Sequence, residues 1–329
     1  MLNPFERLQI PENVEEFIKI QLESLRKIKG NTKKDREIRR LARYFNNLSK
    51  YEIFLKSFPN LDNLHPFYKE SIEIIAKSSI DDVKRCLIKS YKSIKIAKIL
   101  LKKYINKIKK EENDPNLLMR QGFGRASSVL RENKDCINFL ISIAKEAKKL
   151  KSVDPTLPTI IIAGAPNVGK STLVSKISTA KPEIAHYPFT TKDIHVGHIF
   201  IDDSRVQVID TPGILDRPMS ERNLIERKAI NAIVNLNGII VFLIDVSKDS
   251  LYTPEQQINL LKEVINTGKE VIIVLNKIDK KDETIYNQVI SELLRMNRKW
   301  IEISSEKGYN LDILLQETFK LLGIKATGK

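Results

Sequence analysis

Gly164-Ala165-Pro166-Asn167-Val168-Gly169-Lys170-Ser171 is the stretch that decides the fold. It follows the apolar run 159–163, which predicts a short buried strand. It precedes residues 172–180, where apolar side chains recur at helical spacing. A strand, a glycine-rich turn and a helix in this order predict a phosphate-binding loop. The glycines let backbone N–H groups converge on an anion, and the positive end of the helix points at the same anion.

The chemistry of such a loop assigns a role to each side chain. Lys170 supplies a mobile positive charge for the terminal phosphates, and Ser171 supplies a hydroxyl ligand for Mg²⁺. A chance glycine-rich turn is the alternative, which the complete motif and its context disfavour. We expect the phosphates to contact the loop and the first turn of the helix, that is, Gly164, Pro166, Asn167, Val168, Gly169, Lys170, Ser171 and Thr172.

Two further segments predict the rest of a magnesium and γ-phosphate site. Asp210-Thr211-Pro212-Gly213 follows a predicted strand, so the Asp210 carboxylate can hold Mg²⁺ through a water. The backbone N–H of Gly213 can reach the γ-phosphate, which makes the following loop responsive to that phosphate. Thr191, in the loop 187–192, can complete the magnesium shell; the alternative is an ordinary exposed threonine. The predicted metal ligands are therefore Ser171, Thr191 and Asp210.

The segment Asn276-Lys277-Ile278-Asp279 predicts the base that is bound. An ionised carboxylate at Asp279 accepts two hydrogen bonds from guanine, from the ring N–H and the amino group, and adenine offers no such pair. Leaving that acceptor unpaired costs about 1–3 kcal/mol, so ATP is rejected. A second loop follows the last predicted strand and can contact the base. We therefore predict binding of GTP and GDP through Asn276, Lys277, Asp279, Ser304, Ser305 and Glu306.

The second half of the chain alternates strand and helix patterns. A hairpin is predicted from 194–201 and 205–209, and further strands at 238–245, 270–275 and 300–303. Helical patterns lie near 219–235, 255–267, 282–297 and 311–322. This alternation predicts a mostly parallel six-stranded sheet with helices on both faces and the ligand at the carboxyl ends of the strands. Together with the motifs above, it predicts an α/β P-loop GTPase domain over 159–329.

The first half has a helical pattern throughout. Apolar residues recur every three or four positions in 12–28, 32–58, 72–76, 81–108 and 114–150. Thr32 is a plausible cap for the second of these helices. The pattern predicts an all-α bundle over 1–150. The proline-bearing segment 151–158 is the predicted linker to the second domain.

The basic residues are concentrated in the first half. The net charge of the chain is +15; residues 1–150 hold 33 Lys and Arg against 19 Asp and Glu, and residues 151–329 hold 23 against 22. A field of that sign attracts polyanions, which favours nucleic acid as a partner, with contacts to the phosphates of structured RNA rather than reading of bases. The alternative is a lysine-rich solvated surface.

Other features of the sequence indicate where in the cell the protein is expected. No apolar run approaches the roughly 18–20 residues that span a membrane, and the N-terminus lacks the pattern of a secretory signal. Cys86 and Cys136 each stand alone in a helical segment; we interpret them as small buried apolar residues, with a disulfide or a redox pair as alternatives. The four histidines lie too far away in sequence for a metal site with them. We expect a monomer in a reducing cytoplasm, without membrane contact.

Several stretches together resemble a known family. They are Ala165-Pro166-Asn167, residues 187–192 with Val196-Gly197-His198, residues 210–218, His65-Pro66-Phe67-Tyr68, and the helix around 120–131. The second half resembles the Obg-related GTPases, and nearly the whole chain is similar to the Nog (nucleolar GTP-binding protein) family of ribosome-assembly GTPases, in its archaeal-length form. The resemblance implies GTP hydrolysis coupled to maturation of the large ribosomal subunit, with its precursor, rRNA and ribosomal proteins as partners.

Departures from signalling G proteins predict slow turnover. Ile214 occupies the position where those proteins place a water-orienting glutamine, and Pro166 replaces a glycine. Asn167 resembles the asparagine by which related GTPases bind K⁺ beside the phosphates, so K⁺ is a hypothetical further cofactor. The predicted catalytic residues are Lys170, Thr191, Gly213 and Asn167.

Two function classes stay open. The first is a switch, in which GTP orders the loops of Thr191 and Gly213 and changes how the bundle docks on a pre-ribosome. The second is a scaffold that binds rRNA and protein, with a mainly structural nucleotide site. A tRNA-modification or signalling GTPase is disfavoured, because the C-terminus lacks the cysteine motif of the former and the bundle is basic.

Overall fold

A computed structural model describes residues 3–110, 114–150, 153–178, 183–185, 194–202, 204–210, 215 and 224–324. The chain forms two compact units. The helical unit comprises Pro4–Leu64 and Ile75–Lys148. The sheet unit comprises Met1–Asn3, His65–Ile74 and Lys149–Lys329. The predicted division of the chain at 151–158 stays a prediction.

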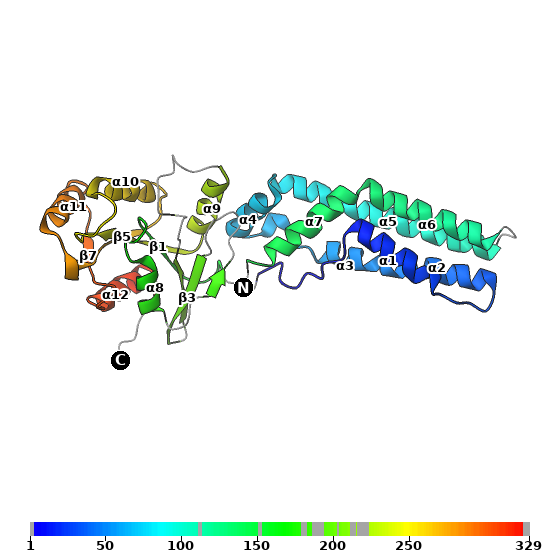
Figure 1. Cartoon of the computed structure of the whole chain (residues 1–329), viewed down its shortest axis with the longest axis horizontal. Helices are drawn as coiled ribbons and strands as arrows, with labels where there is room; N and C mark the ends of the chain where they lie inside the picture. Colours follow the sequence, from blue (N-terminus) through cyan, green and yellow to red (C-terminus); the bar gives the residue numbers. More distant parts are fainter. Residues whose placement is uncertain are drawn as a thin grey trace. The chain divides into compact units, whose positions relative to one another are not determined.

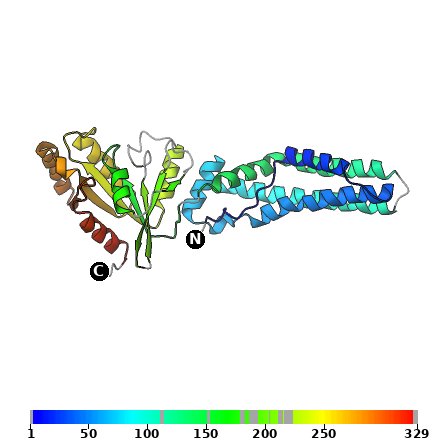
Figure 2. The same cartoon turned by 60° about the horizontal axis from the view of Figure 1, so that its bottom comes forward.

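The helical unit is all-α, as predicted. Figures 1 and 2 show long helices lying side by side along one direction. Its helices are α1 (Val14–Arg26), α2 (Lys33–Asn47), α3 (Ser49–Ser57), the short 3₁₀ helix η1 (Leu61–Asn63), α5 (Ile80–Lys110), α6 (Pro115–Glu132) and α7 (Lys134–Ala147). The predicted cap of α2 is confirmed, because Thr32 accepts a hydrogen bond from the N–H of Asp35 (3.0 Å).

Two of the predicted helices are each divided in the structure. The segment 32–58 forms α2 and α3, which meet at Leu48, and 114–150 forms α6 and α7, which meet at Asn133. At Asn133 the backbone leaves helical geometry (φ −114°, ψ 15°), and its side-chain amide donates to the Val129 carbonyl (3.4 Å). A side chain that bonds to the backbone competes with helix continuation. Apolar periodicity carries through both breaks, so it could not locate them.

The core of the helical unit is aromatic and closely packed. Phe17 lies edge-on against Tyr51, with ring centroids 4.9 Å apart, and also contacts Tyr44. The Tyr44 hydroxyl hydrogen-bonds the Ser127 hydroxyl (3.0 Å), and burial raises the pKa of Tyr44 to about 12. A Cβ on Gly122 would lie 2.8 Å from Cβ of Tyr104, so a glycine is needed for α5 and α6 to pack this closely.

The two cysteines form a disulfide. Cys86 on α5 and Cys136 on α7 are bonded, with their Cα atoms 4.9 Å apart. The interpretation of two buried thiols is therefore wrong, and the disulfide alternative is correct. Spacing in the sequence could not show this, because only the packing of α5 against α7 brings together two residues 50 positions apart.

The sheet unit confirms the predicted fold class and adds one strand. Its strands are β1 (Thr159–Ala163), β2 (Glu183–Ala185), β3 (Ile194–Ile201), β4 (Ser204–Asp210), β5 (Gly238–Asp245), β6 (Val271–Asn276) and β7 (Trp300–Glu302). They form one sheet in the order β2-β3-β4-β1-β5-β6-β7. The predicted hairpin is the antiparallel pair β3–β4, and β1 pairs in parallel with both β4 and β5. The extra strand β2 lies at the edge beside β3.

Helices cover both faces of this sheet (Figures 1 and 2). They are α8 (Lys170–Ile177), α9 (Leu224–Val234), α10 (Pro254–Ile265), α11 (Glu283–Arg295) and α12 (Leu311–Leu321). Most of α4 (Pro66–Ala76) also belongs to this unit. The Glu70 carboxylate of α4 accepts a hydrogen bond from Asn235 (2.9 Å), just after α9. The sequence placed α4 with the bundle, because a helical pattern carries no information about the unit it packs in.

The register of the sheet brings polar residues to one edge. All five residues of β1 are buried, and Ile162 of β1 pairs with Asp210 of β4. On the other side, Asp245 at the end of β5 pairs with Asn276 at the end of β6. The carboxyl ends of parallel strands meet at the same edge, so these side chains surround the loop that follows β1. Within the described residues, every helix is too short or too polar to cross a membrane.

Candidate nucleotide-binding site

The loop between β1 and α8 has a backbone that requires glycine at both ends. Gly164 has φ +135°, and a Cβ there would lie 2.4 Å from the Leu243 carbonyl oxygen. Gly169 has φ +99°, and its Cβ would lie 2.4 Å from Nδ2 of Asn276. Both positions therefore exclude larger residues on two grounds, backbone conformation and space. The first glycine thus lies close to β5, and the second lies close to the end of β6.

Lys170 begins α8 and folds back over the loop. Its ammonium group donates to the carbonyls of Gly164 (2.9 Å) and Ala165 (2.8 Å), and the residue is buried. These bonds fix the positive charge beside the first backbone groups of the helix. A buried cation and a helix N-terminus at the same place favour an anion. This geometry is therefore suited to holding a phosphate group.

Ser171 and Asp210 are brought together although they lie on different elements. The Ser171 hydroxyl donates to Oδ2 of Asp210 (2.5 Å), and Nδ1 of His195 lies 3.8 Å from the same oxygen. Asp210 is fully buried, and its Oδ1 has no hydrogen-bond partner in the part of the chain that the structure describes. A hydroxyl and a carboxylate with a spare oxygen are the ligand types that Mg²⁺ takes. The donor set therefore fits a magnesium ion.

Asn276 connects the two loops of the site. Its amide Nδ2 donates to the Val168 carbonyl (2.8 Å), and its Oδ1 accepts from the N–H (2.9 Å) and hydroxyl (3.0 Å) of Ser305. Asn276 is 1% exposed, so these bonds are buried. Breaking one of them leaves a buried polar group unsatisfied. The phosphate loop and the loop after β7 are thus held in a fixed relation by one side chain.

Asp279 and Lys277 are held by neighbouring side chains. The Ser304 hydroxyl donates to Oδ1 of Asp279 (2.5 Å), and Asp279 is an exposed residue. Lys277 has a left-handed backbone (φ +62°), and its ammonium group donates to Oδ2 of Asp245 (2.5 Å). Ser304 thus orients the Asp279 carboxylate, and Asp245 holds the ammonium group of Lys277.

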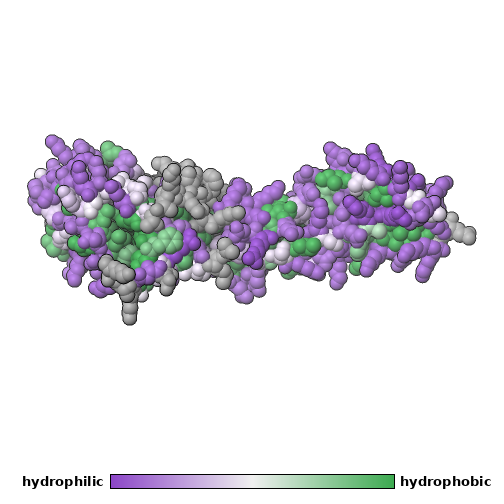
Figure 3. All heavy atoms as spheres, turned by 90° about the horizontal axis from the view of Figure 1, so that it is seen from below, coloured by the Kyte–Doolittle hydropathy of each residue, from purple (hydrophilic) through white to green (hydrophobic). Residues whose placement is uncertain are grey.

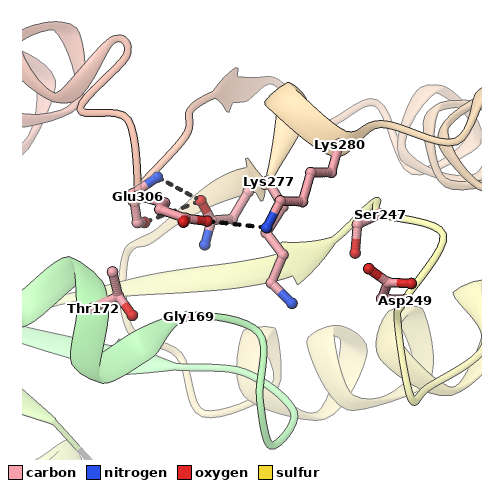
Figure 4. Close-up of a pocket in the computed structure, with 9 residues that line it drawn as sticks. Gly169, Thr172, Ser247, Asp249, Lys277, Lys280 and Glu306 are labelled. Atoms are coloured by element: carbon pink, nitrogen blue, oxygen red, sulfur yellow. Dashed lines mark hydrogen bonds and ion pairs between the residues drawn. The ribbon is translucent and has the colours of Figure 1, made fainter.

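A cavity of about 270 Å³ lies between these loops (Figure 4). It is lined by Gly169, Thr172, Ser247, Asp249, Asn276, Lys277, Lys280, Ser305 and Glu306. Six of these nine residues are predicted site residues; Asp279 is close by but does not line the cavity. Figure 4 shows Lys280 and Glu306 paired across one side, with the ammonium and carboxylate 3.2 Å apart. The hydrogen bond to Glu306 raises the pKa of Lys280.

Sequence reasoning missed four residues of this site: Asp245, Ser247, Asp249 and Lys280. Asp245 accepts from Lys277 and, through Oδ1, from the N–H of Ser247 (2.9 Å). A signal for Asp245 existed, since it ends an apolar strand at the same sheet edge as Asn276. Ser247 and Asp249 lie in a loop after β5 whose course the sequence does not fix, and Lys280 ends the short 3₁₀ helix η3 (Ile278–Lys280), directly after the predicted segment.

The structure describes some of the other predicted site residues and leaves others outside the described ranges. Pro166 is half-buried, and Asn167 is exposed with a left-handed backbone (φ +63°). Val168 is buried and Thr172 exposed. Thr191 and Gly213, with Ile214, lie outside the described residues, so their predicted roles stay predictions.

The fold and this site define the class of the second half. It is a P-loop GTPase domain: residues 159–277 match the family described as 50S ribosome-binding GTPase. Residues 5–154 match the NOG1 N-terminal helical domain. The chain therefore belongs to the Nog family of nucleolar GTP-binding proteins, which confirms the resemblance seen in the sequence.

Three relatives illustrate how far the similarity extends. The chain is 43% identical over 232 residues to the uncharacterised protein MJ1408 of Methanocaldococcus jannaschii, covering 68% of this chain and 63% of that protein. It is 29% identical to nucleolar GTP-binding protein 1 of Drosophila melanogaster, covering 97% of this chain and 50% of that protein. A crystal structure from Plasmodium falciparum assigned to nucleolar GTP-binding protein 1 is 34% identical, with a TM-score of 0.46, over 52% of this chain and 89% of that one. The chain spans half or less of the length of the nucleolar GTP-binding proteins it matches, from 33% to 50%.

Proposed function

We propose that this chain binds GTP and GDP and hydrolyses GTP as a switch in the assembly of the large ribosomal subunit. The observation that carries the nucleotide part is the Asn276 side chain, which joins the phosphate loop to the loop of Ser305 (Val168 carbonyl 2.8 Å, Ser305 N–H 2.9 Å). The nucleotide part of the proposal is also supported by the names of two relatives, which are called nucleolar GTP-binding proteins.

In this proposal the phosphate end is held by the loop and by Lys170. Ser171 and Asp210 hold Mg²⁺, which would neutralise charge on the β- and γ-phosphates when it is bound. The bonds of Lys170 to the loop carbonyls exchange for bonds to phosphate oxygens, so the loop is pre-shaped for its ligand. Thr191 and Gly213 would complete the γ-phosphate contacts and pass its presence to their loops.

The base end is proposed to select guanine through Asp279. The Ser304 hydroxyl donates to one of its oxygens and so orients the carboxylate. Replacing Asp279 by Asn exchanges an acceptor for a donor. We therefore expect Asp279→Asn to lose affinity for GDP by about 1–3 kcal/mol and to gain affinity for xanthine nucleotides. Calorimetry with GDP, XDP and ADP measures this, and wild-type protein that takes up ADP as well as GDP contradicts the guanine proposal.

Intrinsic hydrolysis is proposed to be slow and stimulated by an outside element. Ile214 has no polar group to orient a water, and Pro166 stands where a glycine is usual. Lys170, Thr191, Gly213 and Asn167 are the proposed catalytic residues. If Asn167 binds K⁺, hydrolysis is faster in K⁺ than in Na⁺; equal rates in the two salts exclude that role.

The proposed partners are the precursor of the large ribosomal subunit, its rRNA and its ribosomal proteins. Two observations support this: the GTPase family that matches is described as 50S ribosome-binding, and the helical unit holds 31 Lys and Arg against 17 Asp and Glu. Such a charge attracts RNA. We also propose that the protein acts as a monomer in the cytoplasm.

The switch is tested by binding to large-subunit precursors. We expect the protein loaded with a non-hydrolysable GTP analogue to bind precursor particles more tightly than the protein loaded with GDP. Ser171→Ala is the control, because it weakens the magnesium and γ-phosphate contacts while it leaves the helical unit intact. Equal affinity in both nucleotide states favours the alternative, a scaffold with a structural nucleotide site.

A further inference from the structure

A second cavity, of about 400 Å³, lies within the helical unit, among α1, α2 and α6. Its size is in the range of sites for small organic groups. Three arginines from three helices line it, and an aromatic ring and apolar side chains form the remainder. The lining residues that matter here are Arg26, Arg40, Asn116, Met119, Arg120 and Phe123.

The arginines of this cavity have unused donors. Arg26 and Arg120 are exposed, and neither has an ion pair or a side-chain hydrogen bond with any described residue. The Nη1 group of Arg40 donates to both carboxylate oxygens of the fully buried Glu37 (3.1 and 3.0 Å). The Nε–H of Arg40 is buried and finds no acceptor among the described residues. Buried donors without acceptors are costly, and an anion would satisfy this one.

The carboxylate near these arginines is already neutralised. Glu37 also accepts from Nε of Arg36 (2.8 Å), and Asn116 lies 3.5 Å from the same oxygen. One carboxylate is thus shared by Arg36 and Arg40, and the cavity keeps the charge of Arg26 and Arg120. Planar guanidinium groups match the oxygens of a phosphate. The charge therefore favours a phosphate-bearing ligand.

The aromatic side of the cavity is rigidly supported. The Phe123 ring is half-buried and packs against Tyr44, with centroids 4.8 Å apart and planes at 35°. The adjacent Gly122 is fixed against Tyr104, because no larger residue fits there. A supported, partly exposed ring beside arginines is a platform on which a nucleic-acid base can stack. Apolar Met119 on the same helix adds to that surface.

We propose that this cavity binds one unpaired nucleotide of an RNA, with its phosphate on Arg26 and Arg120 and its base against Phe123. Unpaired bases are the part of an RNA that proteins stack on aromatic rings. The excess of basic residues in the helical unit favours a polyanion over a protein partner. The face of this unit seen in Figure 3 is largely hydrophilic, with small apolar areas between polar ones. The inference deepens the proposed function, on which its choice of RNA rests.

The test compares two RNAs with the full-length protein. One is a hairpin with a single-nucleotide bulge, and the other is the fully paired hairpin with the same loop; affinities are measured by fluorescence anisotropy over a range of salt concentrations. We expect tighter binding of the bulged RNA. Phe123→Leu keeps an apolar side chain without a stacking face, and should weaken binding of the bulged RNA by roughly 5-fold or more while leaving the paired RNA unaffected. Phe123→Tyr should restore the difference.

The arginines are tested with a matched control. Arg26→Gln with Arg120→Gln should weaken binding and lower the salt dependence by about one phosphate contact or more. Lys89→Gln with Lys95→Gln removes the same charge from exposed positions on α5 that do not line the cavity, and should have a smaller effect on the bulged RNA. Denaturant unfolding of the helical unit, measured for each variant, reports that this unit is folded.

Two outcomes overturn the inference. One is equal affinity of the wild type for bulged and paired RNA, or no binding of either. The other is a Phe123→Leu variant that retains the difference, which would mean that the bulged nucleotide does not stack on Phe123. Nucleotide-dependent binding to ribosome precursors is measured on the same variants. If it persists while the bulge has no effect, the cavity proposal fails and the proposed function stands.

Discussion

The nucleotide-binding edge of the sheet unit and the cavity of the helical unit are built in opposite ways. At the sheet edge, short contiguous motifs lie at the ends of strands. The register of the sheet places Asp210, Asp245 and Asn276 around one loop. In the helical unit, three separate helices each contribute an arginine. A functional site can be recognised in the sequence when neighbouring residues in one loop form it. A site made from helix faces has no such signature, and only packing reveals it.

The two units also differ in what holds them together. The sheet unit has an apolar core of buried strands, and glycines and buried hydrogen bonds shape its site. The helical unit depends on aromatic packing, surface ion pairs and one disulfide. The following substitutions test that contrast.

The largest expected effect concerns the disulfide of the helical unit. A cross-link between residues 50 positions apart stabilises by about 4 kcal/mol in the chain-entropy description. We expect Cys86→Ser with Cys136→Ser to lower the free energy of unfolding of the helical unit by about that amount. Denaturant unfolding with and without reductant measures it. GDP affinity should change little; a large loss of GDP affinity would contradict the separate support of the two units.

The next effect concerns Gly164 in the phosphate loop. Gly164→Ala places a Cβ 2.4 Å from the Leu243 carbonyl at φ +135°. We expect the free energy of unfolding of the sheet unit to fall by about 3 kcal/mol or more, because backbone strain and a backbone clash act together. We also expect the variant to lose GDP binding.

Gly124→Ala is the matched control for this substitution. Gly124 lies in α6, and a Cβ there would meet no atom within 4 Å, so an alanine should stabilise the helix by about 0.5–1 kcal/mol. Thermal unfolding and calorimetry with GDP measure both variants. Similar losses for the two glycines would show that Gly164 is not constrained by the site.

A smaller effect is expected at Asn276. Asn276→Ala removes the bonds to Val168 and Ser305 and leaves buried groups without partners. We expect a loss of about 1–3 kcal/mol in stability of the sheet unit. Hydrogen exchange of the loop around Ser305 should rise in this variant. Unchanged exchange there would mean that the two loops are held by something other than Asn276.

The smallest effect concerns Glu52 in the helical unit. Hydrogen bonds from Lys56 first, then Lys98, lower the pKa of Glu52 to about 2. Because the folded pKa lies below the unfolded value of 4.5, the stabilisation is present above about pH 4.5 and is lost as pH falls towards 2. The carboxylate is 28% exposed, so the effect is about 1 kcal/mol or less.

Glu52→Gln should remove this part of the acid dependence. Glu23→Gln, at an exposed position of α1, is the control and should leave the acid dependence of unfolding unchanged. Unfolding midpoints in denaturant between pH 3 and 7 distinguish the two variants. Equal curves would assign the acid dependence of the helical unit to other carboxylates.

The fold class followed from the sequence because strand and helix periods are local. The phosphate loop, the 276–279 segment and the hairpin β3–β4 were located to within a residue or two. The breaks at Leu48 and Asn133 were not, since apolar stripes continue through them. Asp245 was missed because its importance lies in a contact with Lys277, 32 residues away.

The sequence by itself determined the motifs, the basic first half and the family, because each depends on the identity and spacing of residues along the chain. The tertiary structure alone decided the disulfide, the grouping of His65–Ile74 with the sheet unit, and the cavity of Arg26, Arg40 and Arg120. These features join residues far apart in the chain. Their geometry is fixed by how helices pack, which no local pattern encodes.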